Sequence, residues 1–446
     1  MAVLASGSST RLGRGSSALN SSTIQVEKPN MSFTRVSVVG LGYIGLPTAA
    51  VLAASGGVDV VGVDVDPRVV ETVNRGNIHI VEPLLHAIVE AAVGSGRLKA
   101  ALKPEPCDAF LIAVPTPVAE NKSADLRHVF AAADAISEVL KPGDLVVLES
   151  TSPMGTTEKL AARLAERRPD LSFPGISAAP NINVAYCPER VLPGRVIEEL
   201  VSNDRAIGGI TPVCTERAQA LYGLFVKGEL VPTSSKVAEL CKLSENAFRD
   251  VNIAYANELA NVCGLHGVSV SEVIAISNRH PRVNILNPGP GVGGHCIAVD
   301  PWFIVESAPE DTPLIRAARF VNDQRPHKVV AEVTAKIRQH AHPTIACLGL
   351  SFKPDIDDIR ESPAVEVTRL LAEAHPGRVL VVEPHIASLP ETFTRRGVRQ
   401  VELAEALRRA DILVILVDHA VFKAERETIA KASLIVDPRG MLEVRP

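Results

Sequence analysis

The stretch RVSVVGLGYIG, residues 35–45, decides the fold of this chain. Its opening residues are mostly β-branched, which is typical of a buried parallel strand. Gly40 permits a tight turn, Gly42 lets the backbone approach a pyrophosphate, and Gly45 lets the next helix sit close to the strand. The N-terminus of that helix favours an anion. The stretch predicts a dinucleotide-binding unit, although the glycine pattern alone is also consistent with a structural turn.

A second predicted strand, residues 58–64, supports the dinucleotide interpretation. It ends in Asp64, 19 positions after Gly45. An acid at this spacing suits the two ribose hydroxyls and repels a 2′-phosphate, so we expect NAD as the cofactor and not NADP. A solvated strand end is the alternative for Asp64. Arg68 either lies along the adenosine or is a surface charge.

Two further strands are predicted at residues 109–114 and 145–148, and Thr116 and Thr151 follow their ends. The carboxyl ends of parallel strands face the ligand in such a sheet. Both threonines are therefore candidates near the cofactor, and capping of a following helix or turn explains them equally well.

The pattern changes to helical periodicity in the middle of the chain. Residues 236–263 have few helix breakers, and their apolar positions recur every three or four residues, as in one long amphipathic helix. We expect such a helix between two α/β units to carry a dimer interface. Lys242 and Asn246 are four residues apart and share a face of this helix. A solvated lysine and a backbone-bonded asparagine are the alternative for this pair.

A glycine-rich loop at residues 288–294 follows, and it leads to Cys296. Glycine backbone before a thiol permits close approach of a substrate and leaves N–H groups free to hold anions. We expect Cys296 to be a nucleophile and not a buried structural thiol. Asp300 and Lys242 could supply general-base chemistry through a water, and a positive Lys242 favours the Cys296 thiolate.

A second α/β unit begins near residue 344. Strands are predicted at residues 344–349, 378–383, 411–417 and 434–437, without a second glycine fingerprint. Lys353 and Arg360 follow the first of them and suit a phosphate-bearing ligand, with ordinary surface charges as the alternative.

Composition excludes several classes of protein. The chain has 446 residues, a formal net charge of −5 and only 4% aromatic residues, so it resembles neither a nucleic-acid binder nor a membrane protein. No apolar run reaches the roughly 18 residues of a membrane span. The seven cysteines contain no CxxC pair, so we expect reduced thiols, a cytoplasmic protein and no metal site.

These observations predict an α/β protein with two Rossmann-like parallel-sheet domains, joined by a long central helix and a helical connector domain. The expected divisions are a disordered extension at 1–31, an NAD domain at 32–214, a helical dimerisation domain with the cysteine loop at 215–335, and a second α/β domain at 336–446.

The motifs resemble, in order, those of the UDP-glucose/GDP-mannose dehydrogenase family. They are the fingerprint Gly40–Gly45, the Ser150–Thr151 turn, Lys242 with Asn246, GGHC at 293–296 with Asp300, and FKP…DDIRES at 352–362. The resemblance covers the chain from Met31 to its end, with the α/β domain at 336–446 as the part implied to bind the UDP-sugar. It implies an NAD-dependent oxidation of a nucleotide sugar at C6 to the acid, through two hydride transfers and without release of the aldehyde.

The resemblance also implies roles for individual residues. Cys296 would form a thiohemiacetal and then a thioester, Asp300 and Lys242 would assist proton removal, and Lys242 with Asn246 would stabilise the oxyanion. Glu189 would assist hydrolysis of the thioester, and Thr151 would position the water. The implied NAD contacts come from Gly40, Gly42, Tyr43, Ile44, Gly45, Asp64, Arg68, Thr116, Thr151 and Arg360. The implied substrate contacts come from Glu189, Arg190, Val191, Lys242, Asn246, Arg249, Arg279, His280, Arg282, Gly293, Phe352 and Lys353.

Residues 186–194, 278–285 and 300–304 are most similar to the N-acetyl-sugar branch of the family. They imply UDP-N-acetyl-D-mannosamine as the substrate, in a homodimer serving polysaccharide biosynthesis, with UDP-N-acetylglucosamine or another nucleotide sugar as the alternative. Pro193 stands where many relatives with glucose or mannose substrates carry a second glutamate, so the role of that glutamate is absent or is taken by another residue.

Two other classes of function are considered, a Cys-dependent transferase or hydrolase with structural NAD, and a non-catalytic NAD-sensing interaction protein. Both leave the set Lys242, Asn246, Cys296 and Asp300 without a shared purpose.

Overall fold

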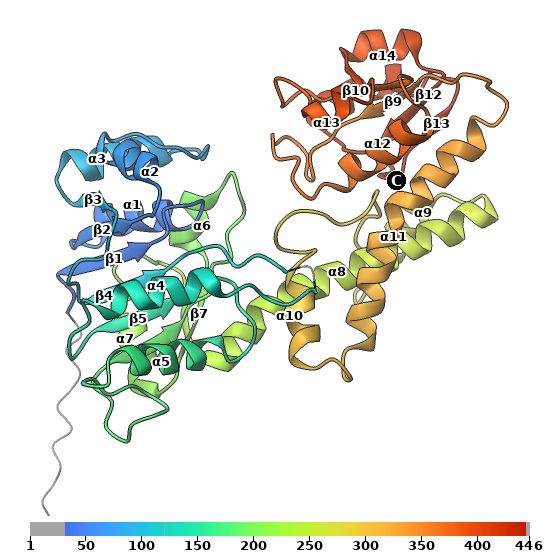
Figure 1. The fold of residues 1–446 in the computed structure, drawn as a ribbon. Coiled ribbons are helices and arrows are strands. Elements are labelled where there is room, and N and C mark those ends of the chain that lie inside the picture. The colour runs from blue at the N-terminus through green and yellow to red at the C-terminus, as the bar shows by residue number, and fades with distance from the viewer. Residues whose placement is uncertain (1–31, 120, 443–446) are drawn as a thin grey trace, which may run out of the picture.

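The computed structural model describes residues 32–119 and 121–442, so the expected extension at 1–31 lies outside the described residues. Two α/β domains stand on either side of a group of long helices (Figure 1). This arrangement confirms the predicted fold class.

The first domain is built on an eight-stranded sheet with the order β3-β2-β1-β4-β5-β6-β7-β8. The strands are β1 Arg35–Val39, β2 Asp59–Val63, β3 Leu98–Ala101, β4 Ala109–Ile112, β5 Leu145–Leu148, β6 Asn183–Tyr186, β7 Arg205–Gly209 and β8 Leu230–Ser234. The pairing is parallel except between β6 and β7, which run antiparallel. The sheet is therefore mixed at this one position, which the sequence pattern does not show.

Helices cover both faces of this sheet, because the strand side chains alternate between two buried clusters. The helices are α1 Gly45–Ser55, α2 Pro67–Asn74, α3 Leu85–Gly94, α4 Arg127–Ser137, α5 Thr156–Arg167, α6 Val196–Ser202 and α7 Pro212–Tyr222. Val36 and Val38 pack with α1 and α3, whereas Val39 packs with α4 and α5.

The predicted boundary after residue 214 differs from the observed sheet. It falls inside α7, and β8 pairs in parallel with β7, so the first sheet extends to Ser234. The helical pattern of α7 led the prediction to assign it to the connector, although this helix packs on the first sheet.

The connector contains α8 Ser235–His266, α9 Val270–Ser277, α10 Asp300–Ser307 and α11 Pro313–Lys336. The Ser234 hydroxyl caps the start of α8, and Gly267 ends it with a φ of 66°. Thirty-two residues make this helix about 48 Å long. Asp250 of α8 accepts hydrogen bonds from Arg319 (2.6 Å) and Asn322 (2.8 Å) of α11, so a buried polar network holds the two helices where they cross (Figure 1).

The third domain has a five-stranded parallel sheet with the order β11-β10-β9-β12-β13. Its strands are β9 Ile345–Leu348, β10 Val379–Val382, β11 Arg399–Gln400, β12 Ile412–Ile415 and β13 Ile435–Val436. Its helices are α12 Pro363–Ala374, α13 Glu391–Thr394, α14 Leu403–Arg409, α15 Ala420–Ala424 and α16 Arg426–Ile429. The short strand β11 was not predicted, since two residues give no periodic signal.

Candidate active site

The turn after β1 has the shape that a dinucleotide requires. Gly40 has a φ of 93°, and a Cβ there would lie 2.5 Å from the Ala113 carbonyl oxygen. A Cβ on Gly45 would lie 1.7 Å from the Gly40 oxygen, whereas a Cβ on Gly42 would meet nothing within 4 Å. The backbone is thus closely packed below the turn and open above it, at the N-terminus of α1, where a pyrophosphate fits. Tyr43 at the tip is half exposed.

Asp64 lies directly beside this turn. Its Oδ2 accepts a hydrogen bond from the Leu41 N–H (3.0 Å), and its Oδ1 accepts one from the Asp66 N–H (2.9 Å). The carboxylate is therefore fixed at the end of β2, on the same edge of the sheet as the glycines. Arg68 is bonded to Asp66 (2.8 Å), and its side chain is 88% exposed.

Thr116 and Thr151 come together at the ends of β4 and β5. The Thr116 hydroxyl donates to the Thr151 carbonyl oxygen at 2.6 Å. The neighbouring Ser150 hydroxyl donates to the Val114 carbonyl oxygen at 2.7 Å. Neither threonine caps a helix, so these bonds instead tie two strand ends into one surface.

Cys296, Asp300 and Asn246 form the centre of the site. The Cys296 carbonyl accepts the Asp300 N–H (2.9 Å), which places the thiol one turn before α10. The Asn246 side-chain amide, on α8, donates to the buried Asp300 carboxylate, and Arg249 donates to the Asn246 carbonyl oxygen. Lys242 is buried on the same face of α8. The structure therefore brings together the helix pair and the cysteine loop.

Burial and the neighbouring charges have opposing effects on the pKa values of Asp300 and Cys296. Burial raises the pKa of Asp300 to about 6, against the effects of Asn246, Lys242 and Arg249. The pKa of the Cys296 thiol is raised by desolvation and then by the Asp300 carboxylate, while Lys242 acts to lower it. Because Cys296 is exposed, desolvation raises its pKa less than it would for a fully buried thiol. The Asp300 carboxylate also raises this pKa. Cys296 is thus a thiol at neutral pH, and a base must take its proton when it reacts.

The segment after β6 lies over the start of α8. The buried Glu189 carboxylate accepts the Val191 N–H at 2.7 Å, and Arg190 pairs with Glu245 of α8 at 2.6 Å. Glu189 also contributes to the electrostatics of Cys296. The predicted residues of this segment therefore border the cysteine site.

The glycine-rich loop also packs closely against the third domain. A Cβ on Gly293 would lie 2.3 Å from the Glu361 oxygen, and one on Gly294 would lie 3.0 Å from the Phe352 ring. The Gly294 N–H donates to the Glu361 oxygen (3.3 Å) and the Gly289 N–H to Asn257 (2.9 Å), so these two groups are not free to hold an anion. The glycines let the loop pack closely on the third domain.

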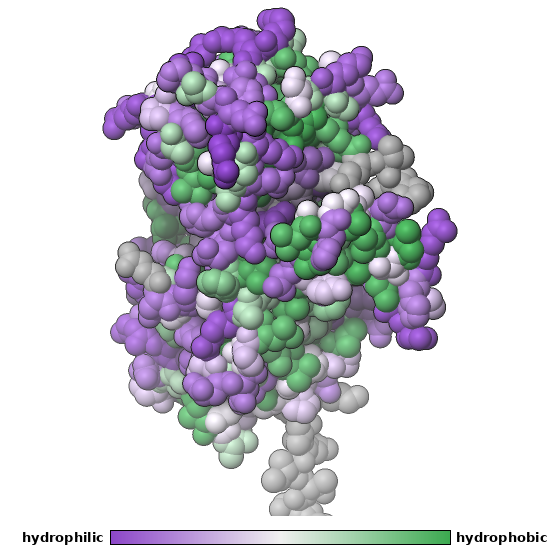
Figure 2. Space-filling view, turned by 90° about the vertical axis from the view of Figure 1, so that its right-hand side faces the viewer, coloured by the Kyte–Doolittle hydropathy of each residue, from purple (hydrophilic) through white to green (hydrophobic). Residues whose placement is uncertain are grey.

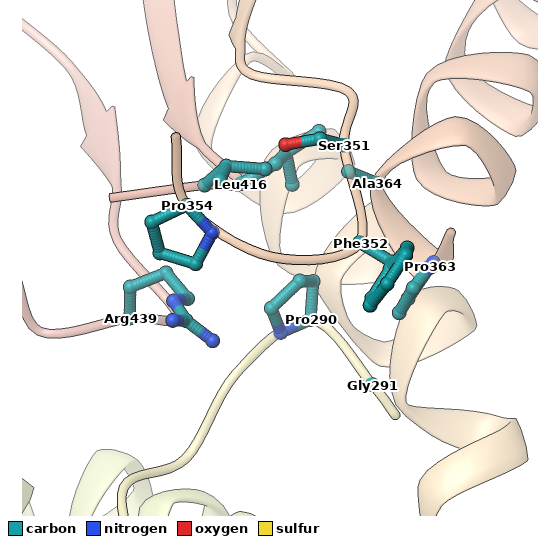
Figure 3. Close-up of a pocket in the computed structure, with 10 residues that line it drawn as sticks. Pro290, Gly291, Ser351, Phe352, Pro354, Pro363, Ala364, Leu416 and Arg439 are labelled. Atoms are coloured by element: carbon teal, nitrogen blue, oxygen red, sulfur yellow. The ribbon is translucent and has the colours of Figure 1, made fainter. Parts of the chain in front are cut away.

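Figure 3 shows this packing, with Pro290 and Gly291 facing the loop that carries Phe352 and Pro354, and Arg439 beside them. Lys353 on that loop is half buried, and burial lowers its pKa against the opposing effect of Glu199 and Glu82 in the first domain. Arg360 pairs with Asp358 (2.7 Å), and Tyr43 contributes to its electrostatics. Lys353 and Arg360 of the third domain therefore face the first domain, and Arg360 does so on the side of the glycine turn after β1.

Three predicted substrate residues lie elsewhere. Arg279, His280 and Arg282 are exposed in the turn after α9. The last turn of α8, which precedes this segment, is about 36 Å along the helix from Lys242. Within one chain, no hydrogen bond or ion pair of the described residues joins these three side chains to the cysteine site.

Some residues around the site were not predicted. Glu82 accepts the N–H groups of Gly194 and Val196, and Glu239 accepts those of Gly155 and Thr157. Sequence spacing gives no signal for these contacts, which join positions 82 to 114 residues apart. Glu245 was missed as well, although it shares the helix face of Lys242 and Arg249.

Comparisons with known proteins agree with this geometry. Three models of the UDP-glucose/GDP-mannose dehydrogenase family match the chain: the NAD binding domain at residues 34–226, the central domain at 236–324 and the UDP binding domain at 346–444. The NDP-N-acetyl-D-galactosaminuronic acid dehydrogenase of Ralstonia nicotianae is 57% identical over 92% of this chain and 97% of its own. The UDP-N-acetyl-D-mannosamine dehydrogenase of Yersinia pestis is 56% identical over 92% of this chain and all of its own.

A solved structure is also similar. The UDP-D-ManNAc dehydrogenase of Pyrococcus horikoshii superposes with a TM-score of 0.82 at 38% identity, over 93% of this chain and 97% of that one. The described helices include none long and apolar enough to cross a membrane. The family resemblance and the expectation of NAD are thus confirmed. The chain belongs to the UDP-glucose/GDP-mannose dehydrogenase family, and it is an NAD-dependent nucleotide-sugar dehydrogenase.

Proposed function

We propose that this enzyme oxidises C6 of UDP-N-acetyl-D-mannosamine to the carboxylate, giving UDP-N-acetyl-D-mannosaminuronate. The observation that carries the chemistry is the Asn246–Asp300 bond, because it places a carboxylate of raised pKa beside the thiol of Cys296 and the ammonium of Lys242. The sugar is proposed from the relatives that are 53–56% identical and named for it.

In the first oxidation, Asp300, acting through a water with Lys242, takes the proton of the C6 hydroxyl as the hydride leaves C6. The glycine turn and Asp64 would hold NAD, which would supply one hydride acceptor for each of the two oxidations. Lys242 then stabilises the developing oxyanion, and one N–H of Asn246 remains available for the same purpose beside the one bonded to Asp300.

Once this base has released the first proton to solvent, Cys296 gives its own proton to the base and attacks the aldehyde carbon, which forms a thiohemiacetal. Loss of the second hydride leaves a thioester on Cys296. Water, positioned by Thr151 and activated by Glu189, breaks the C–S bond, releases the uronate and returns the thiol. The balance is one alcohol, one water and two NAD⁺ converted to one carboxylate, two NADH and three protons.

The two α/β domains supply the two ligand sites in this proposal. The turn of Gly40, Gly42 and Gly45 holds the NAD pyrophosphate, with Asp64 at the ribose. Arg360 reaches toward the same turn from the third domain. Phe352 and Lys353 hold the nucleotide sugar on the other side of Cys296.

A panel of UDP-N-acetyl-D-mannosamine, UDP-N-acetyl-D-galactosamine, UDP-N-acetylglucosamine and UDP-glucose tests the proposal, with NADH absorbance and the acid product measured together. We expect the highest kcat/KM for the manno sugar and two NADH per acid. The galacto sugar is the second candidate, because a relative at 57% identity is named for the corresponding acid. Reduction of NAD by none of the four would contradict the proposed substrate class.

We also propose that two copies associate through α8 in the cytoplasm. Phe248, Tyr255 and Val262 recur every seven residues and are 64%, 53% and 51% exposed in the single chain. Hydrophobic side chains also gather at the level of the central helices on the face at the right of Figure 1, as Figure 2 shows. An exposed apolar stripe of this kind favours burial against a second copy. The free cysteines agree with a reducing compartment.

A further inference from the structure

A buried carboxylate–imidazole pair lies beneath the loop that carries Phe352 and Lys353. Glu383 follows β10 and His419 precedes α15, so the two residues come from strands on either side of β9. Both side chains are fully buried, and His419 Nε2 lies 3.2 Å from Glu383 Oε2. The pair takes no part in the reaction proposed above, and its burial requires a reason.

The backbone fixes the protonation of His419. The Asp355 N–H donates to His419 Nδ1 at 2.9 Å, so Nδ1 is an acceptor and carries no proton. The remaining ring proton lies on Nε2 and is donated to Glu383. The imidazole therefore joins a buried carboxylate to the end of the loop.

Glu383 holds the start of the same loop. Its Oε2 accepts the N–H groups of Leu350 (2.7 Å) and Ser351 (3.2 Å), while its Oε1 accepts the His385 N–H (2.9 Å). Burial raises the pKa of Glu383, but the bonds from His419 and the backbone outweigh this effect and hold it below its usual range. Glu383 is therefore an ionised acceptor for backbone N–H groups, two of which belong to the buried residues Leu350 and Ser351.

We propose that Glu383 and His419 are positioning residues of the nucleotide-sugar site. They clamp both ends of residues 350–355, so that the Phe352 ring rests on Gly294, two positions before Cys296, and Lys353 faces the first domain. Neither residue touches the substrate. This inference rests on the proposed function, because it takes the nucleotide sugar as the ligand of this loop.

The surroundings offer a competing explanation. Ligand atoms of Asp355, His385 and His419 lie within 4.8 Å of one another, as in a metal site. The lone pair of His419 Nδ1 already accepts the Asp355 N–H, however, and a cation would have to displace that bond. The contacts therefore favour a clamp made of protein groups alone.

The test compares His419→Leu, which removes both bonds, with His419→Gln, whose amide still donates toward Glu383. We expect His419→Leu to raise KM for the UDP-sugar about tenfold, equivalent to ~1.4 kcal/mol, with kcat within about twofold and KM for NAD unchanged. His419→Gln should recover most of the loss. The milder Glu383→Gln should raise the same KM to a smaller degree and serves if His419→Leu does not fold.

His385→Leu is the matched control. If Glu383 and His419 form the clamp, the KM of the His385→Leu enzyme for the UDP-sugar should stay near that of the wild type. If the cluster is a metal site, His385→Leu should raise this KM as much as His419→Leu does. Stoichiometric zinc in the purified enzyme, lost in His385→Leu, would overturn the proposal. So would a His419→Leu enzyme with unchanged KM, or one in which both KM values and kcat change together. Wild-type protein that oxidises no UDP-sugar would contradict the proposed function instead.

Discussion

Asn246 on α8 donates a hydrogen bond to Asp300 at the first turn of α10, although the two residues are 54 positions apart. The Asn246 carbonyl oxygen is in turn held by Arg249, so the amide has one orientation. This bond makes the long helix a support for Asp300, the carboxylate that we propose as the base. The position of Asp300 relative to Cys296 then follows from the turn that begins α10.

Asp300 predicts the acidic limb of the pH profile. Its pKa is raised to about 6 mainly by burial, and only the carboxylate form can accept a proton. Activity should therefore be retained above that pH and lost as pH falls through it, with kcat/KM falling about tenfold for each pH unit below. Initial rates of NADH formation in buffers of constant ionic strength measure this, and a flat profile down to pH 4 would exclude Asp300 as the base.

Asp300 also predicts the reactivity of Cys296. The carboxylate helps to raise the pKa of the thiol, so Asp300→Asn should lower that pKa and let iodoacetamide react at a lower pH. The same variant should lose its ability to oxidise the sugar. The pH dependence of alkylation, followed by mass spectrometry with Cys296→Ser as the blank, checks the shift. An upward shift would show that the two groups do not interact as described.

Cys296→Ser should lower formation of the acid by at least about a thousandfold, because a hydroxyl is a far weaker nucleophile than a thiolate. The binding of NAD should persist, since the glycine turn and Asp64 lie in another domain. Acid yield and calorimetric NAD binding are the two measurements. An unchanged turnover rate would remove Cys296 from the mechanism.

Asp64→Ser should weaken NAD binding about tenfold and reduce the discrimination against NADP, because the charge that repels a 2′-phosphate is removed. The carboxylate also holds the Leu41 and Asp66 N–H groups, so part of the loss comes from a looser turn. Asp64→Asn, which keeps an acceptor oxygen, separates the two effects. If the substitution changed neither the affinity for NAD nor the affinity for NADP, the ribose assignment would be refuted.

Local patterns predicted most of the fold. The strand–glycine–helix unit, the long helix and the strands of the third domain each have a period or a breaker that a single sequence displays. The chain of Asp300, Asn246 and Arg249 was predicted only as separate residues, because the contact joins two helices across a long loop. The glycines of the loop at 288–294 were predicted to let a substrate approach and to leave N–H groups free for anions. The structure adds that Gly293 and Gly294 pack against Glu361 and Phe352, a contact that the sequence alone does not reveal.

The boundary of the first domain likewise depends on contacts between distant segments, which a single sequence does not display. The periodicity of α7 is real, but it does not say which sheet the helix covers. That depends on the pairing of β8 with β7, which is set by residues on both strands together. Likewise, Glu239 has no local feature that marks it as a cap for a helix more than 70 residues earlier.

Glu239 predicts a loss of stability without a direct loss of chemistry. Its fully buried carboxylate accepts the Gly155 N–H (2.6 Å), the Thr157 N–H (2.8 Å) and the Thr157 hydroxyl (2.6 Å) at the start of α5. Glu239→Ala should cost about 3 kcal/mol by leaving these donors unpaired, and Glu239→Gln about 1 kcal/mol. Urea unfolding followed by circular dichroism measures both. Wild-type stability in both variants would show that the cap contributes nothing.

The exposed apolar face of α8 predicts that the chain forms a dimer. The dimer in turn predicts a role for Arg279. Phe248→Glu places a charge in the stripe with Tyr255 and Val262 and should convert a dimer into monomers, as light scattering during gel filtration would show. Arg279 follows α9 and has no described hydrogen bond or ion pair to the cysteine site of its own chain, so we expect it to meet the substrate from a second copy.

The monomeric variant should therefore lose activity with its NAD affinity unchanged. Mixing the inactive Arg279→Ala and Cys296→Ser enzymes under subunit exchange should restore about a quarter of the wild-type activity, because one in four sites then combines both intact residues. No restoration in mixed dimers, or full activity of the monomer, would place Arg279 outside the site.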